Sequence, residues 1–327
     1  MPLSLTVRTE RWPVAGSFAI ARGSRTESVV VVAEVSDGTH TGRGECVPYR
    51  RYGETLEKVI AAIEGQRGAL AGGLDRSALQ TAMAPGAARN ALDCAFWDIE
   101  AKRTGRPVHE LAGLPVPHAL TTALTISLGT PDAMGAAAAK AAHRALLKVK
   151  LGGDGDPERI AAVRQAAPRA ELIVDANESW SARNLADNLA ACTAAGVTLV
   201  EQPLPQSADE ALAGIAHPIA VCADESAHDR GSLDRLKGKY EAINIKLDKA
   251  GGLTEALQLA AEAERRGFML MVGCMVATSL SMAPAVLVAQ RARVIDLDGP
   301  LILARDREHG LVYEQSLVHP ATPALWG

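Results

Sequence analysis

Aromatic residues and cysteines are both scarce in this sequence of 327 residues. Phe, Tyr and Trp together make up 3% of the chain, so its core has to be built mainly from Ala, Val, Leu and Ile. The five cysteines lie far apart and include no Cys-x-x-Cys pair: Cys46, Cys94, Cys192, Cys222 and Cys274. This pattern argues against a disulfide framework and a cysteine zinc site, and it indicates reduced thiols in the cytoplasm.

Long apolar runs and an excess of one charge are also missing. No window offers the ~18 uncharged apolar residues of a membrane span, and the N-terminus lacks the basic start and apolar run of a signal peptide. A formal net charge of -4 gives no electrostatic footprint for nucleic acid or an anionic membrane. With 48% apolar and 22% charged residues, the composition is typical of a folded cytoplasmic protein that acts on small molecules.

The first 118 residues combine strand patterns with helix patterns. Three strands are expected, over residues 3–8, 28–35 and 41–46, with a hairpin signal at Asp37-Gly38. Three helices are expected over residues 54–65, 77–83 and 87–103. Strands followed by grouped helices indicate an α+β unit, whose boundary we place near residue 118.

After residue 118, short apolar runs recur about every 22 to 27 residues, with alanine-rich helical stretches between them. The eight runs begin near Thr121, Leu146, Glu171, Val197, Ile219, Glu241, Phe268 and Arg293. Eight strand–helix units favour an α/β fold of the (β/α)8 barrel type. The alternative is an open doubly wound sheet, but the first strand is not followed by Gly-x-Gly-x-x-Gly. We expect the barrel over residues 119–300, and a segment over 301–327, with a short strand at 311–313, that returns to the N-terminal unit.

Charged residues end almost every predicted barrel strand. In chain order they are Lys148 and Lys150, Asp175, Glu201, Asp224, Lys246, and Asp296 with Asp298. The carboxyl ends of barrel strands meet at one mouth, where chemistry is normally found. Asp175, Glu201 and Asp224 follow three neighbouring strands, so they are expected to converge as a magnesium-like site. The absence of Cys and His among these ends argues against zinc.

The lysines at the strand ends predict proton chemistry. Side chains alternate along a strand, so Lys148 and Lys150 share one face and require anions nearby. The second and sixth strands are opposite in a ring of eight, so Lys150 and Lys246 should face each other across the mouth. A substrate carbon between them could lose a proton to one lysine and regain it from the other. A neighbouring cation would lower the pKa of such a lysine.

Each of these residues also has a simpler explanation. A strand-end aspartate often caps the next helix, and strand-end lysines can pair with those same acids in solvent. Asn177 and Glu225 either orient the metal ligands or hydrogen-bond within their loops. Cys94 and Cys222 are better explained as small core residues than as nucleophiles.

Five motifs in order resemble the enolase superfamily, in its muconate-lactonizing subgroup. They are Lys148-Val149-Lys150, Asp175-Ala176-Asn177, Glu201-Gln202-Pro203, Asp224-Glu225-Ser226 and Asn244-Ile245-Lys246. The resemblance covers essentially the whole chain. It implies an α+β capping domain, residues 1–118, on a modified (β/α)8 (TIM) barrel, and a Mg²⁺ cofactor. It also implies a 1,1-proton transfer through an enolate, with Lys150 serving the (R) centre, Lys246 the (S) centre and Lys148 bonding the carboxylate oxygens.

Within the superfamily the chain is most similar to dipeptide epimerases, especially those that act on L-Ala-D/L-Glu in murein peptide recycling. The motif that carries this likeness is Asp296-Leu297-Asp298-Gly299-Pro300, because that family holds the dipeptide ammonium with Asp-x-Asp. The resemblance further implies a loop around residues 18–25 that closes over the substrate. Arg22 is our first choice and Arg25 our second for pairing with a glutamate side chain, although either could be a solvated loop arginine. Thr125 and Cys274 stand where the family contacts substrate.

Several other functions are compatible with these residues. Within the fold, the alternatives are an epimerase of other dipeptides, an N-succinylamino acid racemase and an o-succinylbenzoate synthase, of which Asp-x-Asp speaks against the last two. An aldolase with a Schiff-base lysine would leave the three carboxylates unexplained, and an inactive barrel that only binds would leave the whole site unexplained. The expected partner is a small dipeptide and neither nucleic acid nor membrane; a homo-oligomer is compatible with the sequence.

Overall fold

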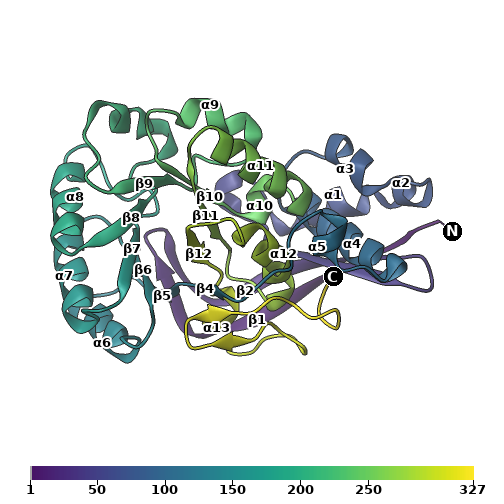
Figure 1. Cartoon of the computed structure of the whole chain (residues 1–327), viewed down its shortest axis with the longest axis horizontal. Coiled ribbons are helices and arrows are strands. Elements are labelled where there is room, and N and C mark those ends of the chain that lie inside the picture. The colour runs from purple at the N-terminus through teal and green to yellow at the C-terminus, as the bar shows by residue number, and fades with distance from the viewer. Residues whose placement is uncertain (1) are drawn as a thin grey trace.

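A computed structural model describes residues 2–327, apart from the side chain of Ser17. It has an N-terminal α+β unit beside an eight-stranded parallel barrel (Figure 1). The N-terminal sheet has the antiparallel order β1-β2-β3, formed by β1 (Ser4–Ile20), β2 (Gly23–Ser36) and β3 (Thr41–Cys46). The 3₁₀ turn η1 (Arg50–Tyr52) and five helices follow: α1 (Leu56–Glu64), α2 (Arg67–Ala71), α3 (Arg76–Ala82), α4 (Ala87–Thr104) and α5 (Val108–Leu111).

The first two strands are much longer than the sequence pattern indicates. Residues 9–27 extend them into a hairpin whose register shifts between Pro13 and Phe18. Most side chains of this extension are exposed or half-buried, so it lacks the apolar alternation from which strands are predicted. In Figure 1 the hairpin reaches from the N-terminal unit across to the barrel.

Helix α4 lies directly on β3 because two glycines face it. A Cβ at Gly44 would stand 2.0 Å from the Ala91 carbonyl oxygen, and one at Gly42 would stand 2.1 Å from that of Ala95. Only glycine allows this approach. The face of α4 that carries Ala91 and Ala95 is therefore the surface that joins helix and sheet.

The barrel strands are arranged in chain order, each hydrogen-bonded in parallel to the next. They are β5 (Leu124–Ile126), β6 (Leu146–Lys150), β7 (Glu171–Asp175), β8 (Val197–Glu201), β9 (Ala220–Ala223), β10 (Ala242–Ile245), β11 (Met269–Gly273) and β12 (Val294–Asp296). The amide of Ala123 donates to the carbonyl of Ile295 (2.8 Å), so the first and last strands meet and the barrel is nearly closed. This confirms the expected barrel.

The helices around the barrel are unequal in length. Full helices follow β5, β6, β7, β10 and β11: α6 (Pro131–Lys140), α7 (Asp156–Ala166), α8 (Leu185–Ala194), α11 (Leu253–Arg265), which the short α10 (Leu247–Ala250) precedes, and α12 (Ser279–Ala289). The other connections hold only η2 (Gln206–Gly214), η3 (Arg230–Ser232) with α9 (Leu233–Leu236), and α13 (Gly299–Ile302). The eight predicted units are thus present as strands, but three of them lack a long helix.

One side chain from each strand, or from the residue beside it, fills the barrel interior. These are Ala123, Leu146, Ile173, Leu199, Cys222, Ala242, Met271 and Val294. Cys222 is fully buried in this layer, and Cys94, on α4, is buried in the core, so both thiols pack as small apolar groups.

After α13 the chain returns toward the N-terminal unit. The strands β13 (Tyr313–Glu314) and β14 (Leu317–Val318) pair with each other, and β14 pairs with β4 (Leu120–Thr121). The predicted strand over residues 311–313 therefore begins only at Tyr313. The Trp326 indole donates to the Cys94 carbonyl (3.0 Å), which anchors this segment on α4.

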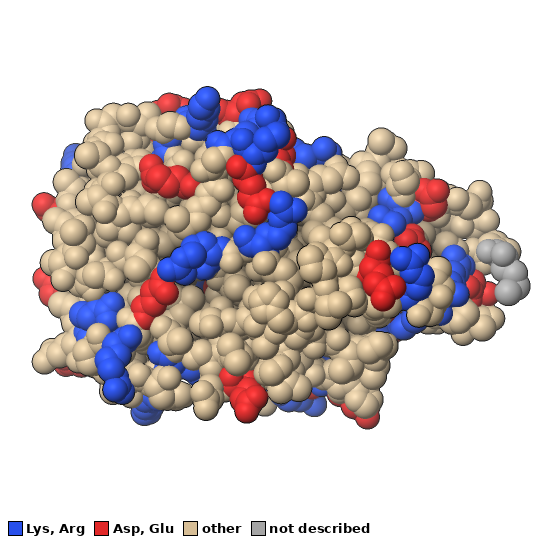
Figure 2. All heavy atoms as spheres, viewed as in Figure 1, with Lys and Arg blue, Asp and Glu red and all other residues tan. Residues whose placement is uncertain are grey.

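Lysine, arginine, aspartate and glutamate side chains are interspersed on the face of the molecule drawn in Figure 2. No broad patch of one sign stands out on that face. Within residues 2–327, no helix combines the length and apolar character that crossing a bilayer requires.

Candidate active site

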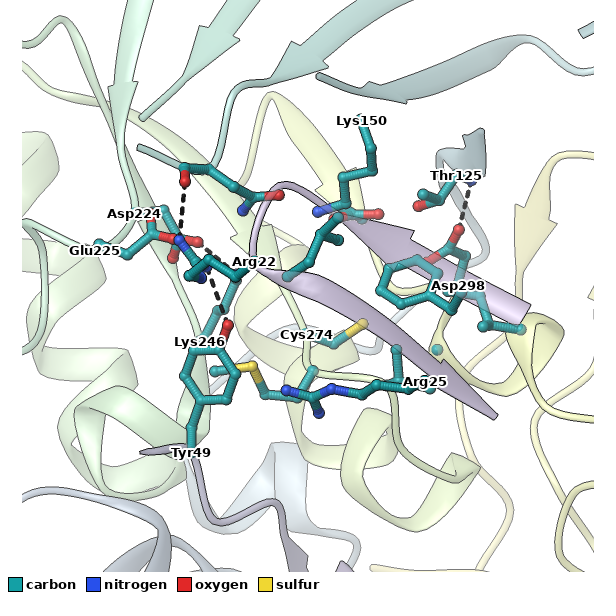
Figure 3. Close-up of a pocket in the computed structure, with 18 of the residues that line it drawn as sticks. Arg22, Arg25, Tyr49, Thr125, Lys150, Asp224, Glu225, Lys246, Cys274 and Asp298 are labelled. Atoms are coloured by element: carbon teal, nitrogen blue, oxygen red, sulfur yellow. Dashed lines mark hydrogen bonds and ion pairs between the residues drawn. The ribbon is translucent and has the colours of Figure 1, made fainter. Parts of the chain in front are cut away.

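The predicted ligands and lysines lie together at the carboxyl ends of the barrel strands. Lys150, Asp175 and Glu201 are the last residues of β6, β7 and β8, and the register places them side by side. Asp224 and Lys246 directly follow β9 and β10. The tip of the β1–β2 hairpin closes over a pocket of about 630 Å³, including its open mouth (Figure 3).

The three carboxylates share one pattern of hydrogen bonding. One oxygen of each is held by a neighbour in the fold: Asp175 Oδ1 by the Asn177 amide (2.9 Å), Glu201 Oε1 by Asn244 Nδ2 (2.7 Å) and Asp224 Oδ1 by Lys249 Nζ (2.6 Å). The other oxygen of each faces a lysine: Asp175 Oδ2 faces Lys150 (2.6 Å), Glu201 Oε2 faces Lys148 (2.5 Å) and Asp224 Oδ2 faces Lys246 (2.6 Å). Each carboxylate is therefore oriented through one oxygen and presents the second to the site.

Lys148 lies deeper in the barrel than the other two lysines at the mouth. Its side chain is 1% exposed, and Nζ lies 2.7 Å from Asp296 Oδ2 and 3.2 Å from Asp175 Oδ2, besides its contact with Glu201. Burial alone would lower its pKa, but Asp296, Glu201 and Asp175 raise the pKa well above its usual range. These carboxylates are the anions that the Lys-x-Lys strand requires.

Lys150 and Lys246 line the pocket from separate walls, because β7, β8 and β9 stand between their strands. Burial would lower the pKa of Lys246, yet Asp224 and Glu201 raise it well above the usual range. The neighbouring cation Lys148 does lower this pKa, as expected, but by less than the carboxylates raise it. Carboxylates outweigh the neighbouring ammonium groups, so Lys246 carries a proton here.

The neighbouring lysines neutralise the three carboxylates to different degrees. The pKa of Asp224 is well below its usual range, because Lys246 and Lys249 outweigh the effect of its burial. The pKa of Glu201, in contrast, is raised to about 7 by burial and by repulsion from Asp175, which Lys148 offsets only in part. The centre of the triad therefore has room for additional positive charge.

The donor set fits a hard divalent cation. Within residues 2–327, no three His, Cys, Asp or Glu side chains already stand in a metal-binding arrangement, because ammonium groups lie between the acids. The chemistry of the set still suits Mg²⁺, since three buried carboxylates on neighbouring strands each direct an oxygen inward. Asn177 contributes its backbone amide, while its Oδ1 atom is buried and meets no hydrogen-bond partner among residues 2–327.

Asp296 ends β12 and contacts Lys148, and Asp298 lies beside Thr125. Asp298 Oδ2 accepts a hydrogen bond from the backbone amide of Thr125 (2.6 Å, Figure 3), whereas Asp296 Oδ1 is buried and has no hydrogen-bond partner within the described chain. Burial and repulsion from Asp296 raise the pKa of Asp298 to about 7. This pair has unmet capacity for a cation, and Thr125 acts on it through its backbone.

Cys274 also lines the pocket. Burial and the nearby Asp296 raise the pKa of its thiol well above the usual range, so it stays a neutral thiol.

The two arginines of the hairpin tip differ in their partners. Arg22 donates to Glu225 Oε1 (2.6 Å), the Asn177 carbonyl (2.9 Å) and the Tyr49 hydroxyl (3.0 Å). Arg25 lies with its guanidinium 5.5 Å from the centre of the Tyr49 ring and forms no ion pair with any described residue. Arg25 is thus the guanidinium that is free to meet an anion in the pocket.

The sequence interpretation did not include Lys249 or the side chain of Asn244. Lys249 is fully buried and donates to Asp224 Oδ1, the Asp224 carbonyl (2.5 Å) and the Asn244 carbonyl (3.0 Å). The sequence does contain one sign of this role: Lys249 lies three residues after Lys246, so the two side chains are about one helical turn apart along α10.

Comparisons with known proteins agree with this geometry. A family model described as "Mandelate racemase / muconate lactonizing enzyme, N-terminal domain" matches residues 3–113, and one described as "Enolase C-terminal domain-like" matches residues 133–322. The L-Ala-D/L-Glu epimerase of Escherichia coli K12 is 47% identical over 97% of this chain and 99% of its own. The N-acetyl-D-glutamate racemase of a Pseudoalteromonas species is 44% identical over 91% of this chain and 95% of its own.

Solved structures show the same likeness. An enolase family member from Agrobacterium tumefaciens with homology to dipeptide epimerases, with bound sodium and L-Ala-L-Glu and an ordered loop, is 55% identical, with a TM-score of 0.98 over 100% of both chains. A dipeptide epimerase from Enterococcus faecalis V583, complexed with Mg and L-Leu-L-Tyr, is 27% identical, with a TM-score of 0.91 over 99% of both chains. This chain belongs to the enolase superfamily, with the N-terminal and barrel domains of the mandelate racemase and muconate lactonizing enzymes.

Proposed function

We propose that this protein is a Mg²⁺-dependent dipeptide epimerase that inverts the α-carbon of the C-terminal residue, with L-Ala-D-Glu and L-Ala-L-Glu as substrates. The observation that carries the proposal is the placement of Lys150 and Lys246 on separate walls of one pocket, each 2.6 Å from a carboxylate of the triad. A planar carbon between two such ammonium groups can be protonated from either face.

The mechanism assigns a separate task to each lysine. When bound, Mg²⁺ would be held by Asp175, Glu201 and Asp224 and would supply positive charge to the substrate carboxylate. Lys148 then donates a charge-assisted hydrogen bond to that carboxylate as negative charge grows on it. Lys150 and Lys246 remove and return the α-proton at their Nζ atoms, and exchange roles with the handedness of the substrate.

The acidic part of the pocket, formed by Asp296 and Asp298, favours a dipeptide with a free α-ammonium group. Asp296 Oδ1 has no hydrogen-bond partner, and Asp298 offers a second carboxylate beside it. An N-acylated substrate would leave Asp298 and the free Oδ1 of Asp296 without a cation, which disfavours its binding. Racemisation of N-acetylglutamate is the second candidate, favoured by the raised pKa of Asp298, because a protonated Asp298 could donate to an acyl oxygen.

The hairpin tip selects the side chain of the substrate's C-terminal residue. We propose that Arg25 pairs with the γ-carboxylate of the substrate glutamate, because Arg22, our first choice from the sequence, is already bound to Glu225. Arg25 stands on the Tyr49 ring, which holds the guanidinium by a cation–π contact.

We also propose three segments: the capping domain over residues 1–118, the barrel over 119–300, and residues 301–327 returning to the cap. The contact of Trp326 with α4 supports the return. Five cysteines without a disulfide support a cytoplasmic location. There the enzyme would serve murein peptide recycling, since L-Ala-D-Glu is a murein dipeptide. A homo-oligomer is compatible with this role.

The experiment that tests the proposal is a substrate panel at saturating Mg²⁺, analysed by chiral chromatography. L-Ala-L-Glu should yield L-Ala-D-Glu with a kcat/KM at least about a hundredfold above those of N-acetyl-L-glutamate and N-succinyl-L-glutamate, because those lack the ammonium. A higher kcat/KM for either acyl amino acid would replace the dipeptide assignment with an N-acylamino acid racemase.

A further inference from the structure

At the tip of the β1–β2 hairpin, Arg22 is the side chain that hydrogen-bonds to the barrel, and the Leu128 amide also donates to the Ala19 carbonyl (3.0 Å). The Arg22 guanidinium reaches the loops that follow β7 and β9, which are the loops next to Asp175 and Asp224 (Figure 3). Besides its bonds to Glu225, the Asn177 carbonyl and Tyr49, it lies 3.4 Å from Glu178 Oε2. Arg22 therefore contacts the cap and two barrel loops at once.

Glu225 depends on this contact. Its side chain is 0% exposed, and Arg22 provides its one hydrogen bond among the described residues, while Oε2 has none. A buried carboxylate without a partner is strongly unfavourable. The cost of leaving Glu225 unpaired thus favours the position in which the hairpin tip is down.

A second arginine from the cap reinforces the same loop. Arg51, in η1, forms a two-pronged pair with Glu178, through Nε to Oε2 (2.7 Å) and Nη2 to Oε1 (2.7 Å). Glu178 and the preceding Asn177 both have positive φ (66° and 46°), so this turn holds an uncommon conformation. The two arginines clamp the turn from the side of the cap.

We propose that Arg22 is a positioning residue that fastens the hairpin tip to the barrel through Glu225, and does not itself read the substrate. This inference rests on the proposed epimerase function. Fastening places Phe18, whose ring centre is 5.9 Å from Lys150 Nζ, and Arg25 against the substrate. Because Glu225, Tyr49 and the Asn177 carbonyl already engage its guanidinium, Arg22 should support every dipeptide equally, whereas Arg25 should support acidic ones.

The test uses L-Ala-L-Glu and its neutral isostere L-Ala-L-Gln with the full-length protein. Arg22→Met should lower kcat/KM about 10- to 100-fold for both dipeptides by a similar factor, as expected for breaking a buried charge pair. Arg25→Met should lower it mainly for L-Ala-L-Glu. Arg22→Met/Glu225→Gln should recover about tenfold relative to Arg22→Met, because the unpaired buried charge is gone.

A measurement without substrate separates fastening from turnover. Chymotrypsin cleavage after Phe18 should be faster in Arg22→Met than in wild type, and unchanged in the matched control Arg11→Met. Arg11 pairs with Glu27 on the same hairpin, but the two side chains are 63% and 48% exposed, so this pair contributes little.

Two results would overturn the inference: a loss in Arg22→Met confined to L-Ala-L-Glu, or a double variant no better than Arg22→Met. If the wild type turns over neither dipeptide, the proposed function fails, and the cleavage rates still decide whether Arg22 fastens the tip.

Discussion

At the scale of single residues, each acid of the triad divides its two oxygens between structure and chemistry. The outer oxygens bind the Asn177 amide, Asn244 and Lys249, which sets the orientation of each carboxylate. The inner oxygens of Asp175 and Asp224 face Lys150 and Lys246, so two of the groups that would hold a cation also hold the proton carriers in place. Small displacements of either set should therefore affect both metal binding and proton transfer.

The two pocket lysines should be individually essential. Lys150→Ala and Lys246→Ala should each lower epimerisation by at least about a thousandfold, within the range lost with a general acid or base. Each variant should still exchange the α-proton of one epimer with D₂O, because the remaining lysine serves one face. NMR of both epimers in D₂O measures this, and loss of less than tenfold in either variant would contradict the two-base arrangement.

The raised pKa of Asp298 predicts that activity depends on pH. Its pKa is raised to about 7, so it is protonated below that pH and loses its attraction for an ammonium group. At saturating Mg²⁺, kcat/KM for L-Ala-L-Glu should fall as pH decreases through about 7. Asp298→Asn should lower kcat/KM about 100-fold or more and remove this limb, with Mg²⁺ affinity unchanged. An identical acidic limb in the variant would assign the titration to another group.

At the scale of elements, the hairpin shows what periodicity can and cannot predict. The strand at 28–35 and the barrel strands follow from apolar runs, because each buries at least one face, whereas the strand at 41–46 follows from the hairpin signal at Asp37-Gly38. Residues 9–27 are a strand only because they pair with each other and reach the barrel, which no apolar pattern records. The short connections after β8, β9 and β12 were missed for a related reason: their alanine-rich or polar segments fit a helix equally well.

The close packing between β3 and α4 predicts how substitutions of glycine should change the free energy of unfolding. Gly44→Ala should lower the free energy of unfolding by about 3 kcal/mol or more, because the new Cβ would overlap the Ala91 carbonyl. Gly68→Ala is the matched control: it lies within α2 with no atom within 4 Å of the new Cβ, so the free energy of unfolding should rise by up to about 1 kcal/mol. Urea titration followed by circular dichroism compares them, and equal midpoints would contradict the packing.

At the scale of the whole molecule, the site is built where two parts of the chain meet. The barrel supplies the acids and lysines, while the N-terminal hairpin supplies the cover and the side-chain contacts. The order of polar strand ends was predictable from the sequence, because the barrel topology turns that order into a ring. The choice between Arg22 and Arg25 was not, because it depends on a contact with Glu225, which lies about 200 residues further along the chain.

Mg²⁺ should stabilise the folded chain as well as support turnover. Chelation with EDTA should abolish epimerisation, and Mg²⁺ at 100 times its Kd should add about 2.7 kcal/mol to the free energy of unfolding. Glu201→Gln removes the central carboxylate of the triad and should remove most of this stabilisation. Thermal unfolding with and without Mg²⁺ checks both proteins, and turnover that persists in EDTA would exclude a metal requirement.

The central claim, proton transfer at the α-carbon of a dipeptide, is tested most directly by incubating L-Ala-L-Glu with the wild-type protein and Mg²⁺ in D₂O. We predict that ¹H NMR will show loss of the glutamate α-proton signal as L-Ala-D-Glu appears, while the alanine α-proton is retained. An unchanged glutamate α-proton signal and no second epimer would contradict the claim.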